Sequence, residues 1–272
     1  MDATNLLLIM SDEHNSKMMG SSGHPLVKTP HLDALARRGT RFSRAYTPSP
    51  ICVPARASFA TGRYAHDTGH WDNSMGYDGK IQGWGHQLQR AGIPVESIGK
   101  LHYRFESDPV GLDQQHIPMH VKDGVGMVHL SVRNQFPGIT PQIRPNGHIA
   151  EAGAGESEYT RYDRRVADIA CDWLRGRSDD TPWVLFVSFV TPHFPLIAPE
   201  EFFAQYPVDD MPLPKFGSHT DFESHPWHDA LVRSTDAAAH GDRAHRTAIA
   251  AYLGLCTFMD HQVGRVLDAL ED

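Results

Sequence analysis

The sequence predicts an α/β fold with a mostly parallel central sheet. Residues 6–10 are continuously apolar without alternation and residues 183–190 are nearly so, and residues 95–99 are predicted to be a further buried strand between them. Such runs are typical of parallel strands that are buried on both faces, because a solvated face would require a polar residue at every second position. Segments with helical signals lie between and after the strands, at residues 29–39, 55–60, 86–91, 160–175 and 243–270. Alternating strands and helices are typical of an α/β fold.

The first helix has clear start and stop signals. Thr29 is expected to cap it, Pro30 suits its first turn because it has no N–H to lose, and Gly39 ends it. Residues 41–47 are expected to be extended and to lead into the next turn. Pro54 then suits the first turn of a helix of small residues that stops at Gly62.

The middle of the chain has weaker signals. Residues 64–80 are polar and glycine-rich, which predicts a loop. Residues 105–158 have no sustained period, which predicts a lid or an insertion. Apolar residues at helical spacing predict the helices at 160–175 and 243–270. Asp260, within the last helix, is expected to be solvated or locally paired.

Composition excludes several classes of protein. With 272 residues, 40% of them hydrophobic, the chain suits one large domain or two small ones. Its formal net charge of −8 argues against a nucleic-acid surface. No apolar run approaches the roughly 20 residues that span a bilayer. Its three cysteines lie far apart and cannot all pair, which favours a reducing, cytoplasmic location without a disulfide framework.

Charged side chains stand where the predicted strands end. Asp12 and Glu13 follow the first strand, Lys100 and His102 end the second, and His193 follows the third. The carboxyl ends of parallel strands are where α/β folds place their sites. Each of these residues also has a structural interpretation, as a solvated strand exit or a loop residue.

Cys52 stands at the mouth of a predicted helix. The unpaired N–H groups there favour an anion, and Arg56, one turn along, offers a forked donor. The alternative is a structural cysteine, because free cysteines are usually buried and inert.

These segments resemble the motifs of the sulfatase family. Cys-x-Pro-x-Arg at 52–56, followed by Thr-Gly-Arg at 61–63, resembles the family signature. Gly-Lys-x-His at 99–102 and His-x-Pro at 193–195 are similar to later sulfatase motifs in the same order. The resemblance implies the alkaline-phosphatase-like three-layer α/β/α sandwich, with residues 1–272 as the N-terminal portion of a sulfatase catalytic domain.

The resemblance also implies a chemistry. In that family a separate formylglycine-generating enzyme oxidises the cysteine, here Cys52, and a hydroxyl of the hydrated aldehyde attacks the sulfur of a sulfate monoester to form a covalent intermediate. Asp12, the oxidised Cys52 and Glu13 would bind a divalent metal. Hard carboxylates favour Ca²⁺, with Mg²⁺ or Mn²⁺ as alternatives. The family usually has Asp or Gln at the position of Glu13, so this ligand departs from the pattern.

The remaining site roles are likewise implied by the resemblance. Arg56 would orient the diol, Lys100 and His193 would hold sulfate oxygens, and His102 would act as the acid/base. Asn73, in the predicted loop, would contact the substrate anion. The implied partners are a small-molecule sulfate ester and the maturing enzyme, with no nucleic acid and no membrane; a homo-oligomer is compatible with the sequence.

Three alternatives remain open. A phosphonate or phosphate ester hydrolase could use the same site, although its relatives tend to have uncharged hydroxyl residues in place of Lys100 and His102. A cysteine hydrolase is disfavoured because Cys52 lacks the local signatures of those families. Sulfatases continue past the last helix into a strand ending in Ser-Asp-His-Gly or Ser-Asp-Asn-Gly, which completes the metal site. We therefore expect a domain incomplete at its C-terminus, with weak metal binding and slow turnover, or a non-catalytic anion- or metal-binding remnant.

Overall fold

A four-stranded parallel sheet lies at the centre of the computed structural model, which describes residues 5–126, 147–177, 181–215, 223, 225 and 240–272. The strands are β1 (Leu6–Met10), β2 (Val95–Lys100), β3 (Gln114–Met119) and β5 (Val184–Ser188), in the spatial order β1-β5-β2-β3. β5 is central, because Val184 is in register with Leu6 on one side and Val95 on the other. The three strands predicted at residues 6–10, 95–99 and 183–190 are confirmed, and so is their parallel pairing.

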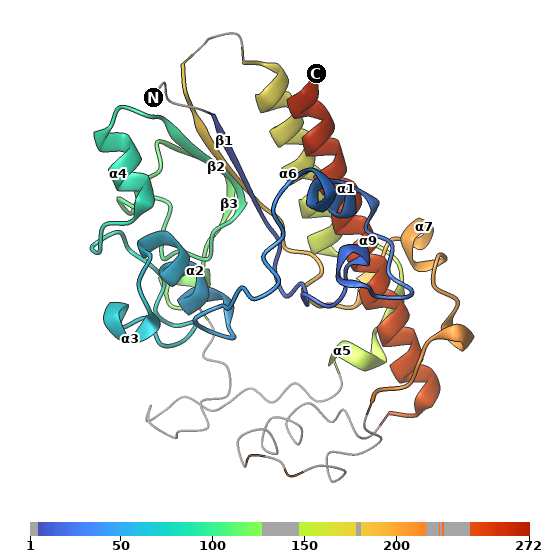
Figure 1. Ribbon diagram of the computed structural model, residues 1–272. Helices are drawn as coiled ribbons and strands as arrows, with labels where there is room; N and C mark the ends of the chain where they lie inside the picture. The colour runs from blue at the N-terminus through green and yellow to red at the C-terminus, as the bar shows by residue number, and fades with distance from the viewer. Residues whose placement is uncertain (1–4, 127–146, 178–180, 216–222, 224, 226–239) are drawn as a thin grey trace.

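Helices cover both faces of this sheet (Figure 1). Leu185 and Val187 of β5 pack against α6 (Glu158–Arg175) and α9 (Asp242–Glu271). Phe186, between them in sequence, packs on the opposite face against α2 (Cys52–Thr61) and α4 (Trp84–Arg90). Successive side chains of a strand point to opposite faces, so a continuous apolar run feeds two cores. The result is a three-layer α/β/α arrangement.

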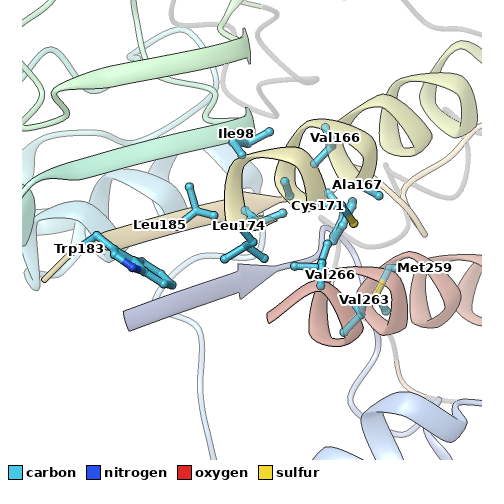
Figure 2. Packing of buried hydrophobic residues seen from close by; sticks show 14 residues of the cluster. Ile98, Val166, Ala167, Cys171, Leu174, Trp183, Leu185, Met259, Val263 and Val266 are labelled. Atoms are coloured by element: carbon cyan, nitrogen blue, oxygen red, sulfur yellow. The ribbon is translucent and has the colours of Figure 1, made fainter. Parts of the chain in front are cut away.

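The core between the sheet, α6 and α9 is formed by aliphatic side chains (Figure 2). Val166 of α6, Val263 and Val266 of α9 and Ile98 of β2 are at most 1% exposed. Burial of each such side chain contributes about 1.5–3 kcal/mol. Cys171 also packs in this core, as predicted, and is 4% exposed. This core fixes α6 against the sheet.

Where the structure describes them, the connections between these elements contain short pieces of regular structure. The helical pieces are η1 (Gly20–Ser22), α1 (Pro30–Arg38), α3 (Ala65–Thr68), η2 (Lys122–Gly124), α5 (Gly147–Ala150), α7 (Glu200–Phe203) and η3 (Val208–Asp210). β4 (Gly153–Ala154) and β6 (Ile197–Ala198) pair in parallel as a second, two-stranded sheet. Residues 41–47 are exposed and contain no strand. Among the described helices, none is both long and apolar enough to cross a bilayer.

β3 was not expected, because it lies within residues predicted to be irregular. Among the described strands it pairs only with β2, so it lies at one edge of the sheet as β1 lies at the other. Its sequence, Gln-Gln-His-Ile-Pro-Met, has neither an apolar run nor regular alternation. Edge strands tolerate polar residues and proline because one row of their backbone groups needs no partner strand. The apolar run that revealed β1 and β5 is absent from β3.

The start of α1 corrects two further predictions. The Thr29 side chain makes no cap hydrogen bond to the helix; its hydroxyl accepts from Gly20 N at 2.9 Å instead. Asp260 of α9 takes over this role and accepts from the N–H groups of His31 and Leu32 at 3.2 and 2.8 Å. Asp260 is only 1% exposed. It is neither solvated nor locally paired, but ties α9 to the N-terminus of α1.

Replacing Asp260 with alanine should therefore destabilise the fold. Two buried N–H groups of α1 would lose their acceptor, which is expected to cost about 1–3 kcal/mol of unfolding free energy. Urea denaturation measures this loss. Asp268→Asn, at an exposed position of the same helix, is the matched control and should change stability by less than about 0.5 kcal/mol. Equal effects of the two substitutions would contradict the capping role.

Candidate active site

The predicted site residues converge at the carboxyl edge of the sheet. Asp12 and Glu13 follow β1, Lys100 and His102 lie at and just after the end of β2, and His193 follows β5. Since parallel strands end at the same edge, residues distant in sequence meet there. Cys52 joins them from the first turn of α2.

Cys52 is the first residue of α2, two positions before Pro54. Its Sγ lies 3.2 Å from His102 Nδ1 and 3.5 Å from Asn73 Nδ2. The Asn73 side-chain oxygen accepts from the backbone N–H of Val53 at 3.1 Å. Asn73 therefore caps the first turn of α2 and contacts the thiol together.

A buried ion-pair group lies beside this helix. Asp12 Oδ2 is 2.7 Å from Lys100 Nζ and 3.1 Å from Arg56 Nη2. The same guanidinium donates through Nη1 to the Lys100 carbonyl at 2.5 Å and to Ser188 Oγ at 3.0 Å. Lys100, Arg56 and Asp12 are 0%, 4% and 8% exposed. Arg56 of α2 thus contacts groups at or just after the carboxyl ends of β1, β2 and β5.

The two carboxyl groups in the site have opposite pKa shifts. Burial alone would raise the pKa of Asp12, but the charges of Lys100 and Arg56 outweigh it and lower the pKa to about 2. Burial, and then the negative charge of Asp12, raises the pKa of Glu13 to about 7. Asp12 is therefore fixed as an anion, whereas Glu13 lies close to its titration point at neutral pH.

His102 is held as a neutral imidazole. Burial lowers its pKa to about 3, and the positive charges of Lys100 and Arg56 add to this effect. Its backbone φ of 51° lies in the left-handed region, as does that of Glu13 at 58°. Such conformations cost about 1–3 kcal/mol and are concentrated at functional sites. Both strained residues face the same site here.

His193 lies across the site from His102. Its Nδ1 donates to the Phe194 carbonyl at 2.6 Å, which leaves Nε2 directed at Glu13 Oε1, 3.3 Å away. The Glu13 carbonyl in turn accepts from the Tyr252 hydroxyl of α9 at 2.7 Å. The ring of Tyr159, on α6, stands perpendicular to that of His193 at a centroid distance of 5.6 Å.

These side chains line one open cavity of about 1230 Å³, which contains Cys52, Asn73, His102, Tyr159 and His193. Ligand pockets for small molecules usually measure about 300–1,000 Å³. The cavity therefore has room for an ester with a substantial leaving group next to Cys52.

Comparison with known proteins identifies the family of the chain. Residues 4–272 match the family model named Sulfatase. The chain belongs to the sulfatase family. It is 32% identical over 98% of its length to the choline-sulfatase of Rhizobium meliloti (strain 1021), and 29% identical, again over 98%, to an arylsulfatase of Clostridium perfringens. Those alignments cover 54% and 59% of the relatives, so the chain spans little more than half of their length.

The sulfatase fold is also found in solved structures. The phosphonate monoester hydrolase of Agrobacterium radiobacter superposes with a TM-score of 0.75 at 23% identity, covering 98% of this chain and 59% of that one. Together with the parallel sheet and its two helical layers, this confirms the alkaline-phosphatase-like α/β/α fold. The recognition of a sulfatase from the motifs is likewise confirmed.

Some of the expected site residues contact Cys52, whereas others contact Asp12. Asn73 and His102 each contact Cys52, as supports of a reacting group would. Lys100 was expected to hold sulfate oxygens and Arg56 to orient the diol. In the structure the Lys100 ammonium contacts Asp12, and the Arg56 guanidinium contacts Asp12, the Lys100 carbonyl and Ser188.

Sulfatases generally depend on a metal and on a formylglycine residue. Within the described residues, no three His, Cys, Asp or Glu side chains are grouped as a metal site. Asp12 and Glu13 have the hard oxygen chemistry that Ca²⁺ or Mg²⁺ prefers, but Asp12 Oδ2 already faces two cations. The described donors therefore do not form a complete metal site.

Four residues of the site were not found from the sequence: Tyr159, Asp163, Ser188 and Tyr252. Three of them lie on helices, where their spacing fits an ordinary apolar stripe or polar face, and Ser188 ends a strand. Asp163 carried the one usable signal, since an aspartate among the apolar positions of a helix requires partners if it is buried.

Proposed function

We propose that this chain forms part of the active site of a sulfuric ester hydrolase, whose nucleophile is residue 52 after oxidation of the cysteine to formylglycine by a separate enzyme. The observation that carries the proposal is the position of Cys52, on the first turn of α2 in contact with His102 and Asn73, beside a buried cationic group.

The charge balance supports an anionic substrate. Lys100 and Arg56 together carry two positive charges against Asp12, which is ionised, and Glu13, whose pKa is raised to about 7. With Glu13 protonated, one positive charge is in excess within a site of low dielectric, where it acts more strongly than in water. The N-terminus of α2 adds a partial positive charge at Cys52. A sulfate ester, as a monoanion, is matched to this balance.

A side chain next to residue 52 can accept a proton from it and return the proton later. When formed, the hydrated aldehyde supplies a hydroxyl nucleophile. His102 Nδ1, 3.2 Å from the Cys52 sulfur, is neutral at physiological pH and can accept or return a proton there. Asn73 fixes the side chain of residue 52 against the first turn of α2. Asp12 and Glu13 are the carboxylates that we propose to contribute to the binding of a divalent cation.

Substrate preference tests the proposal directly. We expect kcat/KM for an aryl sulfate to exceed that for a phosphonate monoester with the same aryl leaving group by about tenfold or more, because Lys100 and His102 stand where relatives that prefer phosphonates tend to have uncharged hydroxyl residues. The measurement is steady-state hydrolysis of both esters by the same preparation, with residue 52 confirmed as oxidised.

The two unfavourable outcomes differ in meaning. A reversed preference would favour a phosphonate monoester hydrolase, a class to which solved structures of the same fold belong. Hydrolysis of neither ester by a protein with oxidised residue 52 would contradict the proposed function and favour a binding remnant.

A further inference from the structure

One buried carboxylate holds the turn that carries His193. Asp163 of α6 is 0% exposed and does not line the cavity. Its Oδ1 accepts from Val190 N at 2.8 Å, and its Oδ2 accepts from Thr191 N at 2.7 Å and from Thr191 Oγ1 at 2.6 Å. Val190 also accepts, through its carbonyl, from the N–H of His193 at 3.1 Å. The backbone just before His193 is thus held by hydrogen bonds to the Asp163 carboxylate and to the N–H of His193 itself.

The three donors need a carboxylate. Each oxygen of Asp163 faces at least one N–H, and Oδ2 receives a hydroxyl in addition. An asparagine at this position would turn its NH₂ group toward a donor, so one contact would become repulsive. Burial raises the pKa of Asp163 to about 6, so at pH 7.5 the group is ionised and accepts at both oxygens.

A second residue of α6 contacts the ring itself. Tyr159 lies one turn before Asp163, and residues four apart lie on the same face of a helix. Its ring meets the His193 ring edge-on at 5.6 Å and 87°. Tyr159 lines the same cavity as Cys52 and His102. Burial, and then the charge of Asp12, raises the pKa of its phenol.

The start of α6 is itself rigid. Ser157 Oγ accepts from Thr160 N at 3.1 Å, and Thr160 Oγ1 accepts from Ser157 N at 2.9 Å. This reciprocal capping fixes the first turn of the helix. The later turns pack in the core between the sheet and α9 (Figure 2). Tyr159 and Asp163 therefore lie on a helix, α6, that is held in place by its N-terminal capping and by core packing.

We propose that Asp163 and Tyr159 are a pair of positioning residues for His193: Asp163 sets the backbone of its turn, and Tyr159 sets the orientation of its ring toward Glu13, in the cavity that residue 52 also lines. The inference rests on the proposed function, because it assigns the purpose of the pair to the use of His193 in that site. Neither residue is a catalytic group on this account. Loss of either should act through His193 alone.

A double-mutant cycle tests this coupling. Asp163→Asn is expected to lower kcat/KM for an aryl sulfate by about 10–100-fold, the usual cost of losing an outer partner of a site residue. In a His193→Ala background the same substitution should lower it less than about threefold, because the group being positioned is gone. A loss of equal size in both backgrounds would overturn the inference and indicate a purely structural role.

Matched variants separate positioning from folding. Asp172→Asn, exposed on the same helix, should leave kcat/KM unchanged. Tyr159→Leu should lower kcat/KM by a few fold, whereas Tyr159→Phe, which keeps the ring edge, should restore it. If Asp163→Asn does not fold, the two Tyr159 variants decide, since Tyr159 is only half-buried. Equal activity of the leucine and phenylalanine variants would then overturn the inference.

The imidazole of His193 provides a readout that does not need turnover. Its side-chain ¹⁵N resonances can be assigned by their loss in His193→Gln. They should shift in Asp163→Asn and in Tyr159→Leu, but not in Asp172→Asn or Tyr159→Phe. Unchanged resonances in the first two variants would overturn the inference. A parent protein that hydrolyses no ester contradicts the proposed function alone, and these spectra then decide whether the pair positions His193.

Discussion

Replacing Cys52 with alanine is expected to lower kcat/KM for an aryl sulfate by on the order of 10⁴-fold or more, as in other enzymes that lose their nucleophile. The Cys52 thiol is the precursor of the proposed nucleophile. Its sulfur lies 3.2 Å from His102 Nδ1 and 3.5 Å from Asn73 Nδ2, so both side chains are placed to act on residue 52. Initial rates with the purified variant measure the loss. Alanine suits the first turn of α2, so the fold should be retained.

The two other cysteines are the matched controls. Cys171 and Cys256 are buried in the core, 4% and 0% exposed, and neither lines the cavity. Alanine at either position should reduce stability modestly while kcat/KM stays within about twofold of the parent. If Cys52→Ala keeps the parent activity, or if all three variants lose it alike, residue 52 is not the nucleophile.

Replacing Asp12 with asparagine is expected to lower the unfolding free energy by about 3–5 kcal/mol, the usual result of removing one partner from a buried ion pair. Lys100 and Arg56 would both remain charged, almost fully buried and without their counter-ion. Chemical denaturation measures the change. Asp209→Asn, whose partner Arg243 is also exposed, should cost no more than about 1 kcal/mol.

The pH dependence of stability provides a second test of the same group. The pKa of Asp12 is lowered to about 2 in the folded protein from its usual 3.8, so folding favours the ionised form. The resulting stabilisation, about 2–3 kcal/mol, is present above pH 4 and is lost as the pH falls from about 4 to 2. The slope of stability against pH in that range should be smaller in Asp12→Asn than in the parent. Identical slopes would contradict the ionised pair.

Three of the four strands of the main sheet and most candidate site residues could be predicted from the sequence, for a physical reason. Side chains on both faces of β1 and β5 pack in cores, so these strands are almost entirely apolar and the polar residues that follow them, Asp12 and His193, stand out. Cys52 was singled out because it stands at the mouth of a predicted helix, one turn before Arg56, in a segment that resembles the sulfatase signature. The edge strand β3 gave no such signal, because its pairing tolerates polar residues and proline.

The buried polar contacts between distant elements could not be predicted. Asp163 lies among the apolar positions of its helix, which indicates a partner without naming it, and Asp260 was expected to be solvated or locally paired. In the structure Asp163 binds the turn after β5 and Asp260 caps α1, more than two hundred residues away. Their partners depend on how helices pack, which a single sequence does not encode as a local pattern. For the same reason, the pairing of Lys100 with Asp12 was not predicted.

The mass of the tryptic peptide that spans residues 45–56 tests the central claim most directly. Conversion of the Cys52 thiol to an aldehyde lightens this peptide by about 18 Da and leaves nothing for iodoacetamide to alkylate. We predict the lighter, unalkylated peptide in protein from a host that matures a reference sulfatase in the same culture. A fully alkylated Cys52 peptide from that host would contradict the account.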